Sequence, residues 1–308
     1  HYCSSFSTGE AKWVASPVEG YADKLSDKSW LKIIRTPPEK MTPHHWRETK
    51  NSFIEATPMQ FASTLGRQAQ KQPIRFAKLS LHFPDNCYAS YISAVLRAQQ
   101  RQTEETPCAD VELTSELIRR FSKTDNDEIF GVIADIVQTR ASEQWPEDIL
   151  QTIKAIALKP LKKTETIVSS NEHEKSAHSL YTHMLNKAQG RAIRAITSLL
   201  FQNYAYFNIF EDAITALASE SEPYMLLALL DCSAACYNID KDYAISLFKK
   251  LVASDIQVTI SHNTWQIICR DFQNDPGFYR QSLIDGIESG VDDLGKHAAS
   301  LLCATAVY

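Results

Sequence analysis

The sequence predicts an all-α fold, an α-solenoid of stacked antiparallel helix pairs. Apolar residues recur with the helical period of about 3.6 through most of the chain and almost never alternate as in a strand. Glycine supplies only 9 of 308 residues, which weighs against folds whose loops need many residues at positive φ. In the second half, alternate helix starts lie roughly 30–40 residues apart, the length of a helical-hairpin repeat.

Helix signals begin near the N-terminus. Ser26 is expected to cap a helix over 27–35, which the run Thr36-Pro37-Pro38 ends. Thr57-Pro58 opens the next helix. Three amphipathic stripes follow: Tyr88, Tyr91, Ile92, Val95 and Leu96; Ile129, Val132, Ile133, Ile136 and Val137; and, after Trp145-Pro146, Ile149, Ile153 and Ile156.

A polar stretch interrupts these patterns. The segment 161–176 has no apolar stripe and is predicted to be a linker or a long loop. We therefore expect N-terminal helical repeats over 1–160 and C-terminal HEAT-like repeats over 177–308. The alternative is one continuous array.

The stretch from Leu185 to Asn203 carries the clearest repeat signal. Behind a corner at Gly190-Arg191 it places one apolar stripe, as in a HEAT-type repeat: Ala192, Ile193, Ala195, Ile196, Leu199 and Leu200. Further helices are expected to begin near 187, 205, 222, 241, 262, 276 and 291, with caps at Ser221, Asp240 and Asp275. Such pairs predict an extended, right-handed, HEAT/TPR-like superhelix.

Two segments of the second half are unusual. Residues 223–237 are apolar on nearly all sides, so this helix should lie inside the stack. It is too short to span a bilayer, and its Asp231, as a buried carboxylate, is expected to have a hydrogen-bond partner. The run Ile256–Ile260 alternates like a strand, but a loop is expected in this helical context.

Composition limits the classes of function. The net charge of −5 and pI near 6.0 give no general attraction to nucleic acid or anionic membranes. No signal peptide is recognisable, and seven scattered cysteines do not form a disulfide framework. These features predict a cytoplasmic protein. Because the first residue is His1 and not Met, we expect a segment of a longer protein.

One near-motif has the spacing of a phosphate-binding loop. Gly290, Gly295 and Lys296 match G-x4-G-K. Such a loop needs a preceding strand and a hydroxyl for Mg²⁺, whereas a helical pattern precedes this one and His297 follows the lysine. Asp292 and Asp293 would repel phosphate. Gly290 is therefore predicted to be a helix C-cap, with the next helix directly after it.

Histidine and cysteine side chains are the candidate metal ligands of this sequence. His173, His178 and His183 are spaced by five, which does not place three imidazoles on one helical face, so a zinc site would need ligands from elsewhere. Cys232 and Cys236 share a face and are interpreted as small core residues.

Other candidates are weaker. Cys108 with a histidine would suggest a thiol hydrolase, but no local signature supports it. The surface candidates are a loop at His44-His45-Trp46, otherwise an ordinary turn, and a short basic patch of Lys159, Lys162 and Lys163. Most tryptophans should anchor the core, and an exposed one would be a candidate hot spot: Trp13, Trp30, Trp46, Trp145 and Trp265. The sequence thus predicts no catalytic, cofactor-binding or metal-binding residue, and it does not identify the partner-binding ones.

Five segments point to a family through their order. They are Ala15–Arg35, Pro73–Ala98, Gly190–Phe201, Tyr237–Leu251 and Gly295–Val307. Together they resemble the C-terminal helical region of bacterial STAND-class NTPases, the group that includes the antiviral Avs sensors.

The resemblance implies a sensor segment. The helical array would bind a foreign protein, such as a phage packaging or portal component, and help an ATPase elsewhere in the parent protein assemble into an active oligomer. ATP and Mg²⁺ would belong to that parent. Two alternatives are a HEAT/TPR-type scaffold for a cellular protein and a small hydrolase or metal enzyme using histidine and cysteine side chains.

Overall fold

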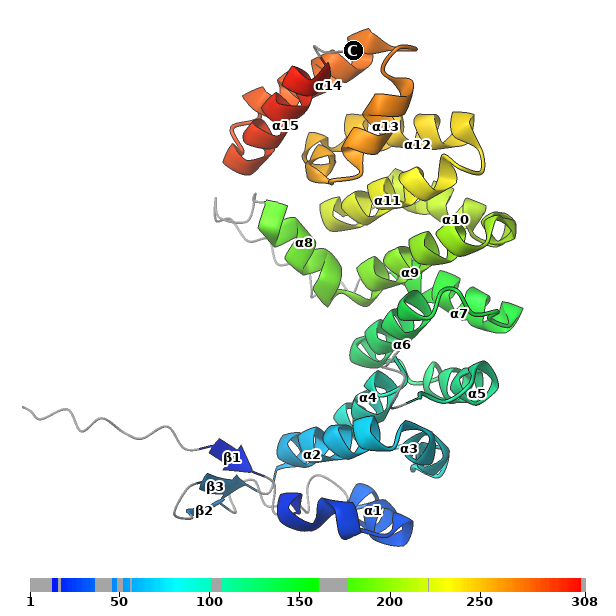
Figure 1. Ribbon diagram of the computed structural model, residues 1–308, viewed down its shortest axis with the longest axis vertical. Helices are drawn as coiled ribbons and strands as arrows, with labels where there is room; N and C mark the ends of the chain where they lie inside the picture. Colours follow the sequence, from blue (N-terminus) through cyan, green and yellow to red (C-terminus); the bar gives the residue numbers. More distant parts are fainter. Residues whose placement is uncertain are drawn as a thin grey trace, which may run out of the picture. The chain divides into compact units, whose positions relative to one another are not determined.

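The computed structural model describes residues 13–15, 18–36, 46–48, 52–55, 57–100, 107–160, 177–220 and 222–305. The chain forms two compact units, His1–Phe121 (unit 1) and Ser122–Tyr308 (unit 2), each shown in Figure 1. The sequence instead suggested a division at 161–176, which lies outside the described residues. Helices on both sides of that segment, at 127–157 and 188–202, pack together within unit 2.

Unit 1 is mainly helical. Its helices are η1 (Glu19–Lys24), α1 (Asp27–Ile34), α2 (Pro58–Lys71), α3 (Pro73–Ser80), α4 (Ala89–Arg97) and α5 (Val111–Phe121). Helix α2 packs against α4, and α3 packs against α2, α4 and α5. The fully buried Trp30 contacts Phe61 and Phe76, each at 5.5 Å between ring centroids, and Phe61 contacts Tyr91 at 5.3 Å. This aromatic cluster joins α1, α2, α3 and α4.

A small sheet accompanies these helices, and the sequence did not predict it. Its strands are β1 (Trp13–Ala15), β2 (Trp46–Glu48) and β3 (Ser52–Glu55), in the order β1-β3-β2. The β1–β3 pair is parallel and the β2–β3 pair antiparallel. Strands of three or four residues are too short for an alternating pattern to be recognised, and their partners are distant in sequence.

Three ion pairs attach η1 and α1 to α2 and α3. Each joins residues 48 apart, so that Arg67 binds Glu19 at 2.6 Å and Lys71 binds Asp23 at 3.2 Å. Arg75 binds Asp27 at 2.6 Å and also donates to the carbonyl of Leu25. The acids and the bases both recur every four residues, about one turn of an α-helix, so the two segments run alongside each other in a fixed register.

Unit 2 consists of helices in two layers. Helices α6 (Asp127–Thr139), α9 (Ala188–Gln202) and α11 (Pro223–Cys236) pack side by side in succession. Helices α7 (Glu147–Ala157), α10 (Phe207–Glu220) and α12 (Lys241–Ser254) lie beside them (Figure 1). The remaining helices are α8 (Ala177–Asn186), η5 (Tyr204–Tyr206), η6 (Ile256–Ile260), α13 (Thr264–Asp271), α14 (Pro276–Glu288) and α15 (Asp292–Thr305). The predicted solenoid of stacked helix pairs is thus confirmed within the units.

Helix α11 lies inside the stack, as predicted. Every residue from Tyr224 to Leu230 and from Cys232 to Cys236 is buried, with α8, α9, α10, α12, η6 and α13 packed around the helix. Its N-cap differs from the prediction, because Glu222 directly precedes Pro223 and Ser221 lies outside the described residues. The run Ile256–Ile260 is a 3₁₀ helix and not a strand, and Asp255 caps it through a hydrogen bond to the amide of Gln257.

Most predicted caps are confirmed. Ser26 accepts a hydrogen bond from the amide of Ser29, and Thr57 from that of Gln60. In unit 2 the side chains of Asp240 and Asp275 accept from the amides three residues on. Tyr88, which the sequence placed in an apolar stripe, is instead the half-exposed N-cap residue of α4.

Gly190 marks a close approach of two helices. The corner between α8 and α9 lies at Lys187, and Gly190 is inside the first turn of α9 and not at the corner itself. A Cβ atom at Gly190 would lie 2.3 Å from the carbonyl oxygen of Met184 in α8. The next residue, Arg191, donates to the carbonyl of Leu185 and to Asp135 of α6. Only a residue without a side chain allows this contact.

Candidate protein-binding surface

The segment with the spacing of a phosphate-binding loop, from Gly290 to Lys296, forms the corner between two helices and the start of the second. Gly290 has φ of +73°, the left-handed conformation that glycine adopts after a helix C-terminus, and it separates α14 from α15. Gly295 and Lys296 lie in the first turns of α15, and Asp292 and Asp293 begin that helix. Acidic residues at a helix N-terminus stabilise its dipole, so the local structure explains these residues without a nucleotide.

The structure does not bring the predicted ligand types together. His173 lies outside the described residues, and nothing is described of the His178 side chain, whereas His183 is exposed on α8. Among the residues that the structure describes, no group of three or more His, Cys, Asp or Glu could hold a metal ion. Cys108 is half-buried, and no disulfide joins the cysteines in the described ranges.

Cys232 and Cys236 are core residues, as predicted. Both are fully buried. A hydrogen bond with Cys232, together with burial, raises the pKa of the Cys236 thiol far above its ordinary value, so the Cys236 thiol is protonated and unreactive at neutral pH.

Asp231 has the hydrogen-bond partners that the sequence required. Its Oδ1 accepts from Ser261 Oγ at 2.6 Å and from Asn263 Nδ2 at 2.9 Å. Burial, followed by the Asp231 charge, raises the pKa of Tyr181 in α8. The carboxylate therefore connects α11 to the loop before α13.

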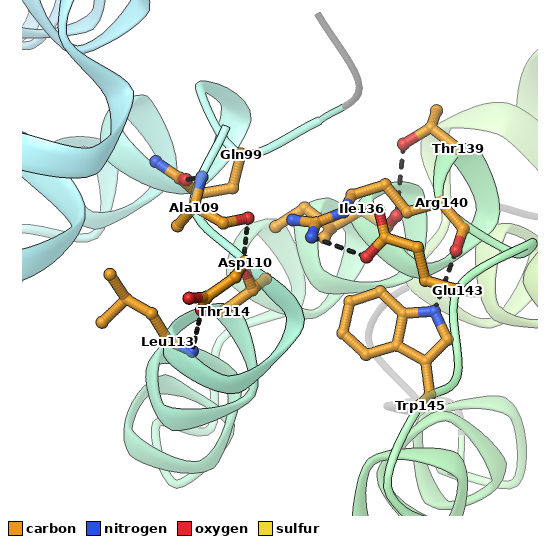
Figure 2. Close-up of polar contacts among 10 residues, drawn as sticks. All are labelled: Gln99, Ala109, Asp110, Leu113, Thr114, Ile136, Thr139, Arg140, Glu143 and Trp145. Atoms are coloured by element: carbon orange, nitrogen blue, oxygen red, sulfur yellow. Dashed lines mark hydrogen bonds and ion pairs between the residues drawn. The ribbon is translucent and has the colours of Figure 1, made fainter. Parts of the chain in front are cut away.

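Two polar clusters stabilise the turns between helices, and Figure 2 shows both. In unit 1 the buried Gln99 side chain donates to the carbonyl of Pro73 and accepts from the amide of Ala109. In unit 2 the buried Arg140 side chain donates two hydrogen bonds to the Glu143 carboxylate, at 3.0 and 2.7 Å. The indole of Trp145 donates to the backbone carbonyl of Arg140. This carbonyl lies at the C-terminus of α6, where carbonyls lack intrahelical partners.

Of the three lysines predicted to form a basic patch, Lys159 lies among the described residues, and it binds two carboxylates of its own unit. Lys159 lies 2.7 Å from both Asp125 and Asp127 and over the ring of Phe130. Partial burial lowers its pKa, but the hydrogen bonds and charges of the two aspartates outweigh this and leave the pKa raised. Lys162 and Lys163 lie outside the described residues, as do His44 and His45.

Exposed large apolar side chains mark the candidate surface. In unit 2, Phe201 at the end of α9 is 44% exposed and Tyr204 in η5 is 53% exposed. Asn203, between them, accepts from the amide of Ala205 and so stabilises the turn that presents them. Among the described residues of unit 1, Met59 is the most exposed large apolar residue, at 67%. Sequence periodicity could not identify these residues, because an apolar residue next to a stripe is ordinarily assigned to the core.

The tryptophans behave mostly as predicted. Trp30 and Trp145 are buried core residues, and Trp265 is half-buried. Nothing is described of the side chains of Trp13 and Trp46, which lie in β1 and β2. No tryptophan with a described side chain is therefore an exposed hot-spot candidate.

Comparison with known proteins gives no match: no family profile, curated protein or solved structure is significantly similar to the chain. Within the described ranges, no helix combines the length and the apolar character that crossing a membrane requires.

Proposed function

We propose that this chain is a protein-binding module, and that it serves as the ligand-sensing segment of a STAND-class NTPase in antiviral defence. Stacked helices give each unit an extended surface, and long surfaces typically bind macromolecules. The observation that carries the proposal is the exposed aromatic pair, Phe201 and Tyr204, on a corner held by Asn203. Aromatic side chains on a rigid frame are typical of interface hot spots.

A protein is a better candidate partner than nucleic acid. The chain carries a net charge of −5, and nucleic-acid affinity arises mainly from lysine and arginine contacts to phosphate. Several bases of the described residues are engaged by carboxylates, among them Arg67, Lys154, Lys159 and Lys249. The order of segments that resembles the STAND family favours a phage packaging or portal protein as the ligand.

The alternative is a HEAT/TPR-type scaffold for a cellular protein. It uses the same surface, and the difference lies in the partner and the parent protein. Sensing requires that the segment control the activation of an NTPase, whereas a scaffold does not.

Binding by the chain itself gives the first test. The purified 308-residue protein is presented to a panel of phage portal and packaging proteins by biolayer interferometry. Phe201→Ala and Tyr204→Ala should each weaken binding about tenfold or more, a loss of about 1.4 kcal/mol. The matched control is Gln202→Ala, an exposed neighbour on the same corner, which should leave the affinity unchanged. Unchanged binding by both aromatic variants would place the interface elsewhere.

Activation of the parent NTPase gives the second test. The parent protein is co-expressed with the phage panel, with and without residues 1–308. Loss of activation with intact nucleotide binding supports the sensor. Retained activation in the truncated protein would exclude sensing by this segment and leave the scaffold.

A further inference from the structure

Helix α14 leaves one face uncovered in unit 2. With α15 it lies at one end of the unit (Figure 1), and it packs chiefly against α15 and η6. Its buried side includes Tyr279, Leu283 and Gly286. On the opposite face Ile284 is 36% exposed and Ile287 39% exposed. Single exposed isoleucines are ordinary on a protein surface, so the apolar residues alone do not say what covers this face.

The charges on the same face are arranged symmetrically about Ile284. Arg280 precedes it by four residues and Glu288 follows it by four, so the three side chains form one row along the helix surface. Arg280 and Glu288 are both exposed, and neither has an oppositely charged partner among the described residues. Arg280 lies over the ring of Phe272, 5.4 Å from its centroid, and this contact restrains the guanidinium while leaving it in water.

We propose that two copies of this chain associate through α14, with the two helices antiparallel and the two-fold axis at Ile284. In a two-fold interface the same surface serves both copies, so the residue four before Ile284 lies opposite the residue four after it in the other copy. Arg280 of each copy therefore meets Glu288 of the other, and the opposite-charge contact occurs twice. A parallel arrangement would bring like charges together, so the charges also select the orientation.

The centre of the paired helices is apolar. Ile284 of one copy lies against Ile284 of the other, and Ile287 lies opposite Gln281. The side-chain amide of Gln281 already donates to Asp285 at 2.8 Å, so this donor keeps its acceptor when the second copy covers it. Burial of the isoleucines supplies the affinity, and the charge pairs set the register and the orientation.

The contact is small. The 13 residues of α14 span about 20 Å, at about 1.5 Å per residue. One pair of such helices buries less than the roughly 1,200 Å² at the lower end of stable interfaces, so a weak dimer is expected, with a Kd in the micromolar range. The pairing uses no residue of the corner at Phe201 and Tyr204 and is independent of the proposed function.

Sedimentation velocity of the whole 308-residue chain tests the pairing. The wild type should change from monomer to dimer between about 1 and 200 μM. Arg280→Glu and Glu288→Arg each bring like charges together at both contacts, so each variant alone should dimerise about tenfold or more weakly. An equimolar mixture of the two variants restores both opposite-charge contacts and should form a heterodimer with the wild-type affinity.

The matched control is Arg270→Glu in α13. Arg270 is exposed and lies over the ring of Tyr237 at 5.0 Å, so this variant makes the same change of charge and loses the same kind of ring contact as Arg280→Glu. It should dimerise as the wild type does.

Three outcomes would overturn the proposal. A wild type that stays monomeric up to about 200 μM would leave this face to a helix of a different protein. A dimer that persists unchanged in Arg280→Glu, or a mixture of the two variants that does not associate, would also exclude the pairing. If a variant does not fold, hydrogen exchange of the wild type decides. Protection of α14 should rise over the same range of concentration while that of α6 stays constant, and α14 protection independent of concentration would refute the pairing.

Discussion

Gly190 is the position where the structure makes the sharpest quantitative prediction. A Cβ atom there would lie 2.3 Å from the carbonyl oxygen of Met184 and 3.0 Å from its carbonyl carbon and Cα. These are backbone atoms of α8, so the overlap cannot be relieved by a side-chain rotation. Overpacking of this kind typically costs 1–3 kcal/mol of stability. Because the clash here is with backbone atoms, we expect a cost for a Cβ at Gly190 of about 3 kcal/mol, the upper end of that range.

Helix propensity acts in the opposite direction. Replacing glycine by alanine inside a helix stabilises it by about 1 kcal/mol. The net expectation for Gly190→Ala is therefore a destabilisation of unit 2 by about 2 kcal/mol. Gly190→Val should cost about 3 kcal/mol, because a β-branched residue gains less in propensity and overlaps more.

Urea unfolding monitored by hydrogen exchange in α8 and α9 measures this loss within unit 2. The matched control is Gly295→Ala in α15, where a Cβ would lie 3.5 Å from the nearest atom, the carbonyl oxygen of Ile287. That contact is ordinary, so Gly295→Ala should be neutral or stabilising by up to about 1 kcal/mol. A Gly190→Ala protein as stable as the wild type would refute the argument that close backbone approach selects glycine at this position.

Three further predictions concern charges. In a double-mutant cycle of Asp27→Asn and Arg75→Gln, the coupling in unit 1 should be about 0.2–1 kcal/mol and should shrink in 1 M salt, since the pair is partly exposed; an unscreened or larger coupling would contradict this. A hydrogen bond from Lys249, then that from the Phe278 amide, lowers the pKa of Asp275. The contribution of Asp275 to the stability of unit 2 is therefore present above pH 3.8 and lost as the pH falls below this value. The hydrogen-exchange protection of α14 should show this acid-dependent loss in the wild type and not in Asp275→Asn. Calorimetry with Mg-ATP should detect no binding by the chain, and micromolar binding abolished by Lys296→Ala would restore the phosphate-loop interpretation.

Local signals were sufficient for the helices and their caps. Asp240 and Asp275 are recognisable because a cap requires only a short acceptor side chain directly before an apolar stripe, and both partners lie within four residues. Helix α11 was recognisable for the same kind of reason, since uniform apolarity implies neighbours on all sides. The left-handed conformation of Gly290 likewise follows from its place after a helix.

Contacts between distant residues were beyond the sequence. The acids and bases that pair across 48 residues in unit 1 are visible as charges, but nothing local says which partners meet. The exposure of Phe201 and Tyr204 depends on where the neighbouring helices end, and the division of the chain after Phe121 depends on which helices share a core.

The sequence alone specifies the helical class, most helix boundaries, the buried course of α11 and the need of Asp231 for a hydrogen-bond partner. The partners of that carboxylate, Ser261 and Asn263 of the loop before α13, are known from the folded arrangement alone. The physical reason is the range of the interactions. Periodicity and capping act within one or two helical turns and are encoded locally, whereas hydrogen bonds and packing between helices arise only when the chain returns to the same place.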